Sequence, residues 1–142
     1  MDILLLGSGG REHAIAVALK ASPKCGELYV APGNGGTACI AKNVKLDIND
    51  PAAVADFAVE HNVGLVVIGP EAPLVAGVAD AVRAKGIPAF GPGAQGAQME
   101  GSKRFAKEFM ERHGIPTAAY RSFSEQSPAL AYVSERFAAG VS

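Results

Sequence analysis

The chain has 142 residues, of which 49% are hydrophobic and 19% are charged, and its formal net charge is −1. This composition is typical of one folded globular domain, so it excludes a disordered chain, and the lack of a basic excess argues against nucleic acid as a partner. No apolar stretch reaches the roughly 18 residues of a membrane span, and no basic segment precedes the first apolar run, so we expect neither a membrane helix nor a signal peptide.

The first elements are a buried strand and a helix. Residues 2–6, DILLL, form an apolar run that ends at Gly7, which is typical of a strand buried on both faces. Apolar residues then recur at helical spacing from Arg11 to Ser22, and Pro23 follows. We expect a helix that ends before this proline.

Two short strands and a second helix come next. Residues 27–30, ELYV, predict a strand, residues 31–38 a glycine-rich loop, and residues 43–46, NVKL, another strand. Asp50 followed by Pro51 is typical of a helix start, with aspartate as the N-cap and proline at the first helical position. The apolar face of this helix is predicted to hold Val54, Phe57 and Ala58.

The clearest strand of the chain is residues 65–68, LVVI. A helix is predicted to run through Val75, Val78, Ala79 and Val82 and to stop at Gly86. Residues 88–90, PAF, predict a fifth strand, which ends at the glycine-rich stretch GPGAQGAQ.

Strands and helices therefore alternate with short connections, which predicts an α/β fold with a Rossmann-like, doubly wound parallel sheet. Ligands of such sheets bind outside the carboxyl ends of the strands. The glycine-rich loops at residues 7–10, 33–36, 69–73 and 91–96 all follow predicted strands. We expect the binding site among these loops.

The character of the sequence changes at Ser102. Residues 1–101 carry 7 Lys and Arg against 10 Asp and Glu, whereas residues 102–142 carry 6 against 4. The second part predicts a helix capped by Ser102, a strand near residues 120–123, and a capped amphipathic helix from SPALAYVSERF. We therefore expect two units, residues 1–101 and residues 102–142.

The loop GSGGREH, residues 7–13, resembles the dinucleotide fingerprint GxGxxG only in part. Gly7 and Gly9 match its first two glycines, but Glu12 stands where the third glycine belongs. No acid follows the second strand, where a dinucleotide's ribose would need one. A nicotinamide or flavin cofactor is therefore disfavoured. Backbone N–H groups at the helix start, with Arg11, still suit an anion such as phosphate; the alternative is a tight turn with Arg11 in solvent.

Glu71 lies between two prolines after the strand at residues 65–68. A rigid carboxylate beside a phosphate pocket suits the hydroxyls of a ribose, and the alternative is a solvated loop acid. The three histidines are not clustered, so we assign no metal ligand. Cys25 and Cys39 fit neither a disulfide framework nor a CxxC site, so we expect free thiols in the reducing cytoplasm.

Several segments together closely resemble the family of phosphoribosylamine–glycine ligases, which are ATP-grasp enzymes. They are LLLGSGGREHAIA, YVAPGNGGTA, VVIGPEAPLVAGVAD, AFGP, MEGSKRFAKEFMERHGIPTAAYRSF and PALAYV, in the family's order. The resemblance implies a Rossmann-like domain followed by the start of an ATP-grasp domain. It implies ligation of glycine to 5-phosphoribosylamine, giving glycinamide ribonucleotide, ADP and phosphate, with Mg²⁺ or Mn²⁺ accompanying ATP.

The loops and the resemblance together select the candidate residues. The candidate substrate-binding residues are Gly7, Ser8, Gly9, Gly10, Arg11, Glu12, Pro32, Gly33, Asn34, Gly69, Pro70 and Glu71. In similar enzymes the lysine of the GSK motif reaches the ATP phosphates, which implies Lys103 here, with Lys107 one turn further on. The alternative is a solvated basic face. We assign no catalytic residue within the chain.

Similar enzymes continue beyond the position of Ser142, so the chain is expected to be the N-terminal part of a longer ligase. We expect it to be inactive alone and open to self-association through the apolar faces after residue 102. Its other partners would be small molecules. The alternative function is a non-catalytic α/β module that binds a phosphosugar or a nucleotide.

Overall fold

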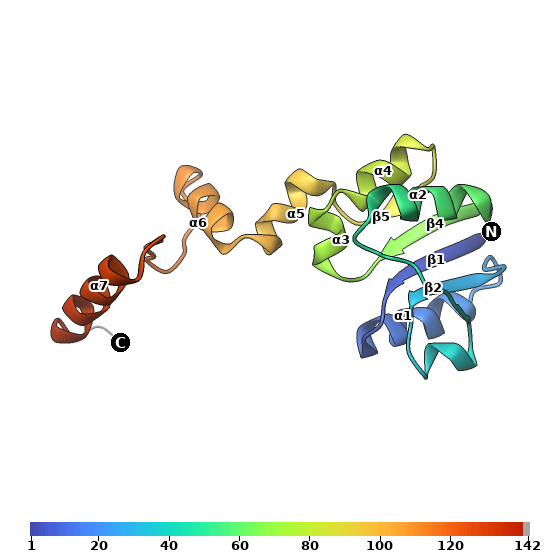
Figure 1. The fold of residues 1–142 in the computed structure, drawn as a ribbon, viewed down its shortest axis with the longest axis horizontal. Helices are drawn as coiled ribbons and strands as arrows, with labels where there is room; N and C mark the ends of the chain where they lie inside the picture. The colour runs from blue at the N-terminus through green and yellow to red at the C-terminus, as the bar shows by residue number, and fades with distance from the viewer. Residues whose placement is uncertain (141–142) are drawn as a thin grey trace. The chain divides into compact units, whose positions relative to one another are not determined.

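The computed structural model describes residues 1–140, which form two compact units, Met1–Gly101 and a second unit that begins at Ser102. The first unit is built on a five-stranded parallel sheet in the order β3-β2-β1-β4-β5. Figure 1 shows β2, β1 and β4 side by side within it. The prediction of a doubly wound α/β fold is thereby confirmed. The strands are β1 (Asp2–Gly7), β2 (Leu28–Pro32), β3 (Lys42–Asn43), β4 (Val63–Ile68) and β5 (Ala89–Phe90).

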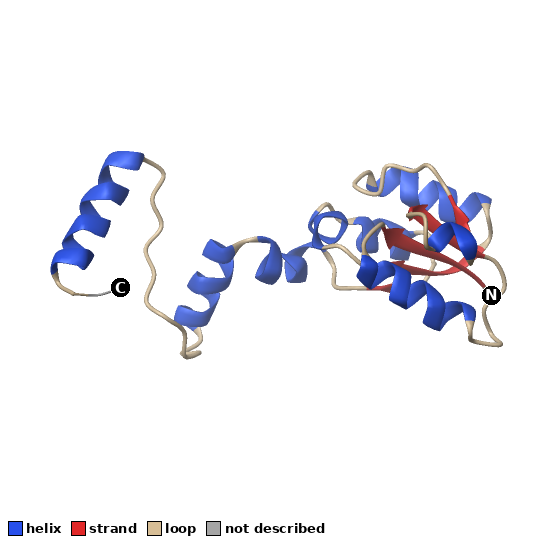
Figure 2. Cartoon of the chain, turned by 90° about the horizontal axis from the view of Figure 1, so that it is seen from below, coloured by secondary structure: helices blue, strands red, loops and turns tan. Residues whose placement is uncertain are grey.

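Helices cover both faces of this sheet (Figure 2). They are α1 (Gly10–Lys20), α2 (Pro51–Glu60), α3 (Glu71–Val75), α4 (Val78–Ala84) and α5 (Ala94–Gly101), with a short 3₁₀ turn, η1, at Thr37–Cys39. The alternation of β1 side chains explains the two layers. Leu4 and Leu6 pack in the cluster that holds the residues of α2 and α4, whereas Ile3 and Leu5 pack in the cluster of α1.

The start of α2 follows the prediction. The side chain of Asp50 accepts hydrogen bonds from the backbone N–H groups of Ala52 and Ala53, and Pro51 is the first helical residue. Val54 and Ala58 are fully buried against the sheet, and Phe57 packs on the same cluster. This face fixes the helix on the sheet.

Two predicted elements between β2 and β5 are wrong in their extent. The strand at residues 43–46 is reduced to β3, because after Val44 donates to the Val30 carbonyl the chain leaves the ladder and only packs on the core. The helix through Val75 and Val82 is broken into α3 and α4 at Gly77, whose φ of 93° lies in the left-handed region.

The glycine-rich stretch at residues 91–96 is a loop only as far as Gly93, because α5 begins at Ala94. The carboxylate of Asp80 on α4 accepts a 2.7 Å hydrogen bond from the Ala94 N–H and so satisfies the start of α5. The sequence has no capping residue directly before this helix, so the prediction missed it.

The second unit contains α6 (Lys103–Arg112) and α7 (Gln126–Ala138). Ser102 caps α6 as predicted, accepting a hydrogen bond from the Phe105 N–H. The strand predicted near residues 120–123 is wrong, because the described part of this unit offers no strand to pair with it. The predicted cap of α7 is also wrong, since the helix begins after Glu125 without a side-chain hydrogen bond.

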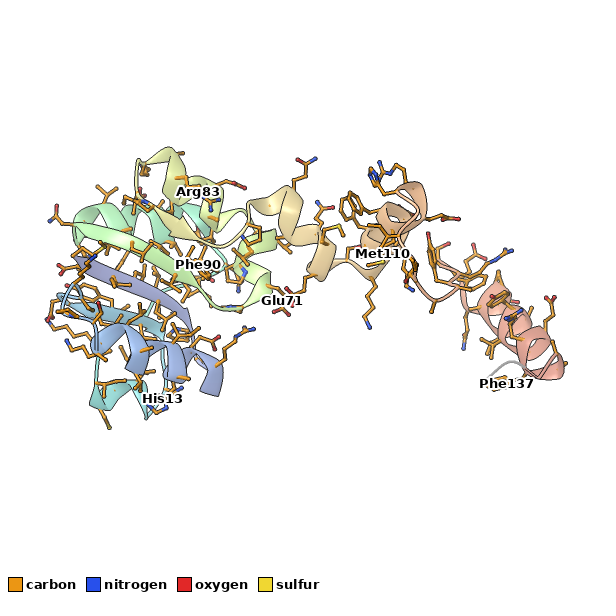
Figure 3. All side chains as sticks on the ribbon, turned by 180° about the vertical axis from the view of Figure 1, so that it is seen from behind. His13, Glu71, Arg83, Phe90, Met110 and Phe137 are labelled. Atoms are coloured by element: carbon orange, nitrogen blue, oxygen red, sulfur yellow. The ribbon has the colours of Figure 1, made fainter. Side chains whose placement is uncertain are left out.

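The apolar side chains of α7 are exposed over a large fraction of their area. Leu130 is 58%, Val133 44% and Phe137 68% exposed, and Figure 3 shows Phe137 on this helix. Self-association through these exposed apolar side chains of α7 stays a prediction. Among the described residues, no helix has the length and apolar character needed to cross a membrane.

Candidate functional site

Three of the four predicted loops meet at the carboxyl edge of the sheet. Because β1 lies between β2 and β4, the loops that follow these strands are neighbours. The Gly33 N–H donates to the Gly7 carbonyl at 3.2 Å, and the Gly69 N–H donates to the Leu6 carbonyl at 3.1 Å. The structure therefore brings together the candidate residues of these three loops.

The centre of this cluster is the side chain of Glu12, in the first turn of α1. One carboxylate oxygen accepts from the Gly9 N–H and the other from Arg11 Nε, both at 2.8 Å. Arg11 Nη2 donates to the Gly69 carbonyl at 2.6 Å. Glu12 is 5% exposed, whereas the Arg11 side chain is 61% exposed. The pair thus ties the loop after β1 to the loop after β4.

Both members of this pair are held in their charged forms. Burial alone would raise the pKa of Glu12, but the hydrogen bonds from Arg11 and the Gly9 N–H outweigh it and lower that pKa below its ordinary value. The hydrogen bond and charge of Glu12 raise the pKa of Arg11. The edge therefore presents a permanent guanidinium charge.

The glycines of the first loop have different roles. A Cβ on Gly7 or on Gly69 would collide with the Glu12 side chain, so these two glycines make room for the carboxylate. A Cβ on Gly10 would meet no atom within 4 Å. Within residues 1–140, the N–H groups of Gly10 and Arg11 have no hydrogen-bond partner. Open backbone donors at a helix start, beside Arg11, suit an anion.

The loop after β2 is held by a polar network. The Asn34 amide donates to the Ser8 carbonyl at 2.8 Å, and its oxygen accepts from the Gly36 and Thr37 N–H groups. Thr37, fully buried, donates to the Asn43 amide oxygen, and Asn43 donates to the Asn34 carbonyl. Asn34 was among the predicted site residues, whereas Thr37 and Asn43 were not, because their spacing carries no recognised motif.

The remaining candidates are placed at the same edge with fewer contacts. Glu71 is exposed at the first position of α3, after Pro70, and Figure 3 shows it there. Its negative charge adds to the raised pKa of Arg11, after the larger contributions of the Glu12 hydrogen bond and charge. Pro32 ends β2 and is exposed. The His13 ring occupies the space where Gly36 would carry a Cβ. Residues 1–140 hold no group of three His, Cys, Asp or Glu side chains that could bind a metal.

The three cationic side chains at the start of α6 differ in their hydrogen bonds and ion pairs. Arg104 pairs with Glu108 at 2.7 Å, and Lys107 donates to the Thr117 hydroxyl and the Ala118 carbonyl. Lys103 is exposed and has no ion-pair or hydrogen-bond partner among residues 1–140. A separate open groove of this unit is lined by residues from Glu111 to Ser122, and it includes none of the candidates.

Comparison with known families gives two matches that together span the chain. Residues 1–100 match the model described as phosphoribosylglycinamide synthetase, N domain. Residues 101–141 match the model described as phosphoribosylglycinamide synthetase, ATP-grasp (A) domain.

Individual proteins agree with these family matches. The phosphoribosylamine–glycine ligases of Pseudomonas aeruginosa and Vibrio cholerae are each 54% identical to the chain over 138 residues, which is 96% of the chain and 32% of either ligase. The chain thus spans about a third of the length of these relatives. The crystal structure of the Thermotoga maritima phosphoribosylamine–glycine ligase matches with 30% identity and a TM-score of 0.63. The match spans 85% of this chain and 27% of that ligase. Phosphoribosylglycinamide synthetase from Anaerococcus prevotii shares the fold, with a TM-score of 0.67 at 16% identity. The match spans 94% of this chain and 34% of that protein.

Proposed function

Because the chain belongs to the phosphoribosylglycinamide synthetase family, we propose that it supplies the phosphosugar-binding part of a phosphoribosylamine–glycine ligase. The reaction joins glycine to 5-phosphoribosylamine at the expense of ATP, giving glycinamide ribonucleotide, ADP and phosphate. Glycine is activated as an acyl phosphate, which the amine of the ribosylamine attacks. The remaining two thirds of the relatives' length would supply the rest of the ligase.

The observation that carries this proposal is the edge formed by the loops after β1, β2 and β4. The free N–H groups of Gly10 and Arg11 would bind the phosphate of the sugar, and the Arg11 guanidinium would add a charge-assisted hydrogen bond. Glu71, exposed at the start of α3 after β4, would accept hydrogen bonds from ribose hydroxyls. Gly7, Ser8, Gly9, Pro32, Gly33, Asn34, Gly69 and Pro70 would shape the backbone of this pocket.

We place the border between the phosphosugar domain and the start of the ATP-grasp domain at Gly101 and Ser102. The change in charge at Ser102, the cap of α6 and the division into two units support this border. The cytoplasm is the proposed compartment, because Cys25 and Cys39 are free thiols, as a reducing environment would keep them.

The nucleotide part of the proposal assigns Lys103 to the ATP phosphates, and Lys107 is the weaker candidate because its ammonium group is already engaged. Three cations in the first turns of α6 oppose the helix dipole, and a bound polyphosphate would offset this cost. Mg²⁺ or Mn²⁺ would neutralise phosphate charge in the transfer. The described residues offer no three-residue ligand group, so we assign no metal ligand within them.

Lys103→Ala in the full-length ligase is expected to weaken the binding of an ATP analogue by about tenfold, because one charge-assisted hydrogen bond to phosphate is lost. Calorimetric titration measures the effect. Arg104→Ala is the matched control, since Arg104 is exposed on the same helix but is paired with Glu108. Equal affinities of wild type and Lys103→Ala would contradict the assignment.

An ADP-release assay with glycine and 5-phosphoribosylamine tests the proposed function as a whole. The full-length ligase is expected to release ADP only when both substrates are present. The 142-residue chain alone is expected to release no more than the blank without enzyme, because it spans a third of its relatives. A full-length protein without turnover would overturn the proposal.

A further inference from the structure

Glu12 is the one charged side chain that is buried within residues 1–140. We infer that it is a positioning residue, which holds the Arg11 guanidinium in place for phosphate without touching the ligand itself. This inference rests on the proposed function. It gives Glu12 a different role from that of the other residues of the loop.

The surroundings of the carboxylate support this role. Glu12 lies between the backbones of Gly7 and Gly69, where neither residue has room for a Cβ. Its oxygens accept hydrogen bonds from the chain itself, from Gly9 and from Arg11. At 5% exposure, the side chain offers almost no surface to a ligand. The carboxylate is thus part of the packed interior of the loop cluster.

The opposite charges of Glu12 and Arg11 also give the two residues different roles toward phosphate. An ionised carboxylate in direct contact with phosphate would repel the phosphate. A buried carboxylate paired with a guanidinium instead cancels only part of the guanidinium's positive field. Arg11 uses Nε on Glu12 and Nη2 on the Gly69 carbonyl. Its Nη1 group makes no hydrogen bond within residues 1–140, and the side chain is 61% exposed. Glu12 therefore aims a partly free guanidinium outward.

Affinity for ribose 5-phosphate, measured by titration calorimetry on the 142-residue chain, tests the inference in two backgrounds. Glu12→Gln keeps the shape but removes the charge, and we expect it to weaken binding about tenfold in the wild-type background. In the Arg11→Ala background the same change should alter affinity by less than about twofold, because the group on which Glu12 acts is gone. Glu60→Gln, an exposed acid at the end of α2, is the matched control.

Equal losses in both backgrounds would mean that Glu12 contacts the ligand directly, and no loss in either would mean that it does not position Arg11. Either result overturns the inference. Circular dichroism checks that each variant folds. If Glu12→Gln does not fold, Glu12→Asp replaces it, since a shorter acid keeps the charge but cannot reach both donors.

A second measurement needs no ligand. Proton exchange of the Gly9 N–H and the Arg11 Nε–H, followed by NMR, should be slow in the wild-type chain and fast in Glu12→Ala, because both donate to Glu12. Exchange that is equally fast in both chains would overturn the inference. A wild-type chain that does not bind ribose 5-phosphate would contradict the proposed function. Slow proton exchange in the wild-type chain that becomes fast in Glu12→Ala would still show that Glu12 holds both groups.

Discussion

Gly7→Ala is expected to destabilise the first unit by about 2–4 kcal/mol, the largest effect on stability that we predict for a single methyl group. Gly7 has a φ of 130°, which a residue with a Cβ rarely adopts, and the added Cβ would collide with the Glu12 side chain. The substitution therefore strains the backbone and displaces a buried carboxylate together. Urea unfolding followed by circular dichroism measures the change.

Gly10→Ala is the matched control for Gly7→Ala. Gly10 begins α1, and a Cβ there meets no atom within 4 Å. Alanine is a better helix former, so this variant should gain up to about 1 kcal/mol. Gly7→Ala should cost less in a Glu12→Ala background, where only the backbone strain remains. Equal stability of the Gly7→Ala and Gly10→Ala chains would contradict the packing around Glu12.

The parts of the fold that could be predicted are those decided by local pattern. β1 and β4 are continuous apolar runs that end at glycine, and such runs are read directly as buried parallel strands. The cap of α2 by Asp50 and that of α6 by Ser102 depend on one side chain each. The start of α5 depends instead on a contact between residues distant in sequence, the hydrogen bond from the Ala94 N–H to Asp80, which no local pattern encodes.

The candidate site divides in the same way. The position of the loops follows from the strand order, and Arg11 and Glu71 were named from their loops alone. The internal structure of the cluster did not follow, because the glycines at positions 7 and 69 are far apart in sequence and serve the same carboxylate. Asn43 was missed because its hydrogen bonds with Thr37 and Asn34, six and nine residues away, follow no recognised motif. The sequence therefore predicts where the loops lie, whereas the packing of Gly7 and Gly69 around Glu12 appears only in the folded structure.

Arg11→Ala is expected to weaken the binding of ribose 5-phosphate to the chain by roughly 10- to 150-fold, the largest effect on affinity that we predict. Two consequences add. The variant removes a charge-assisted hydrogen bond to phosphate, and it releases the contact with the Gly69 carbonyl that joins two loops of the edge. In the full-length ligase the change should raise the KM for 5-phosphoribosylamine and leave the KM for ATP nearly unchanged.

Arg83→Ala separates the loss of ligand binding from the loss of a loop contact. Arg83 also donates to backbone carbonyls beside the carboxyl edge, those of Ala89 and Gly91, but it belongs to none of the candidate loops. Its removal should loosen β5 and leave affinity for ribose 5-phosphate unchanged. Arg11→Lys keeps the charge but cannot donate to Glu12 and Gly69 in the same fork geometry, so its affinity should fall between wild type and Arg11→Ala. A rise in the KM for ATP alone would move Arg11 to the nucleotide, and equal losses in Arg11→Ala and Arg83→Ala would reduce it to a structural contact.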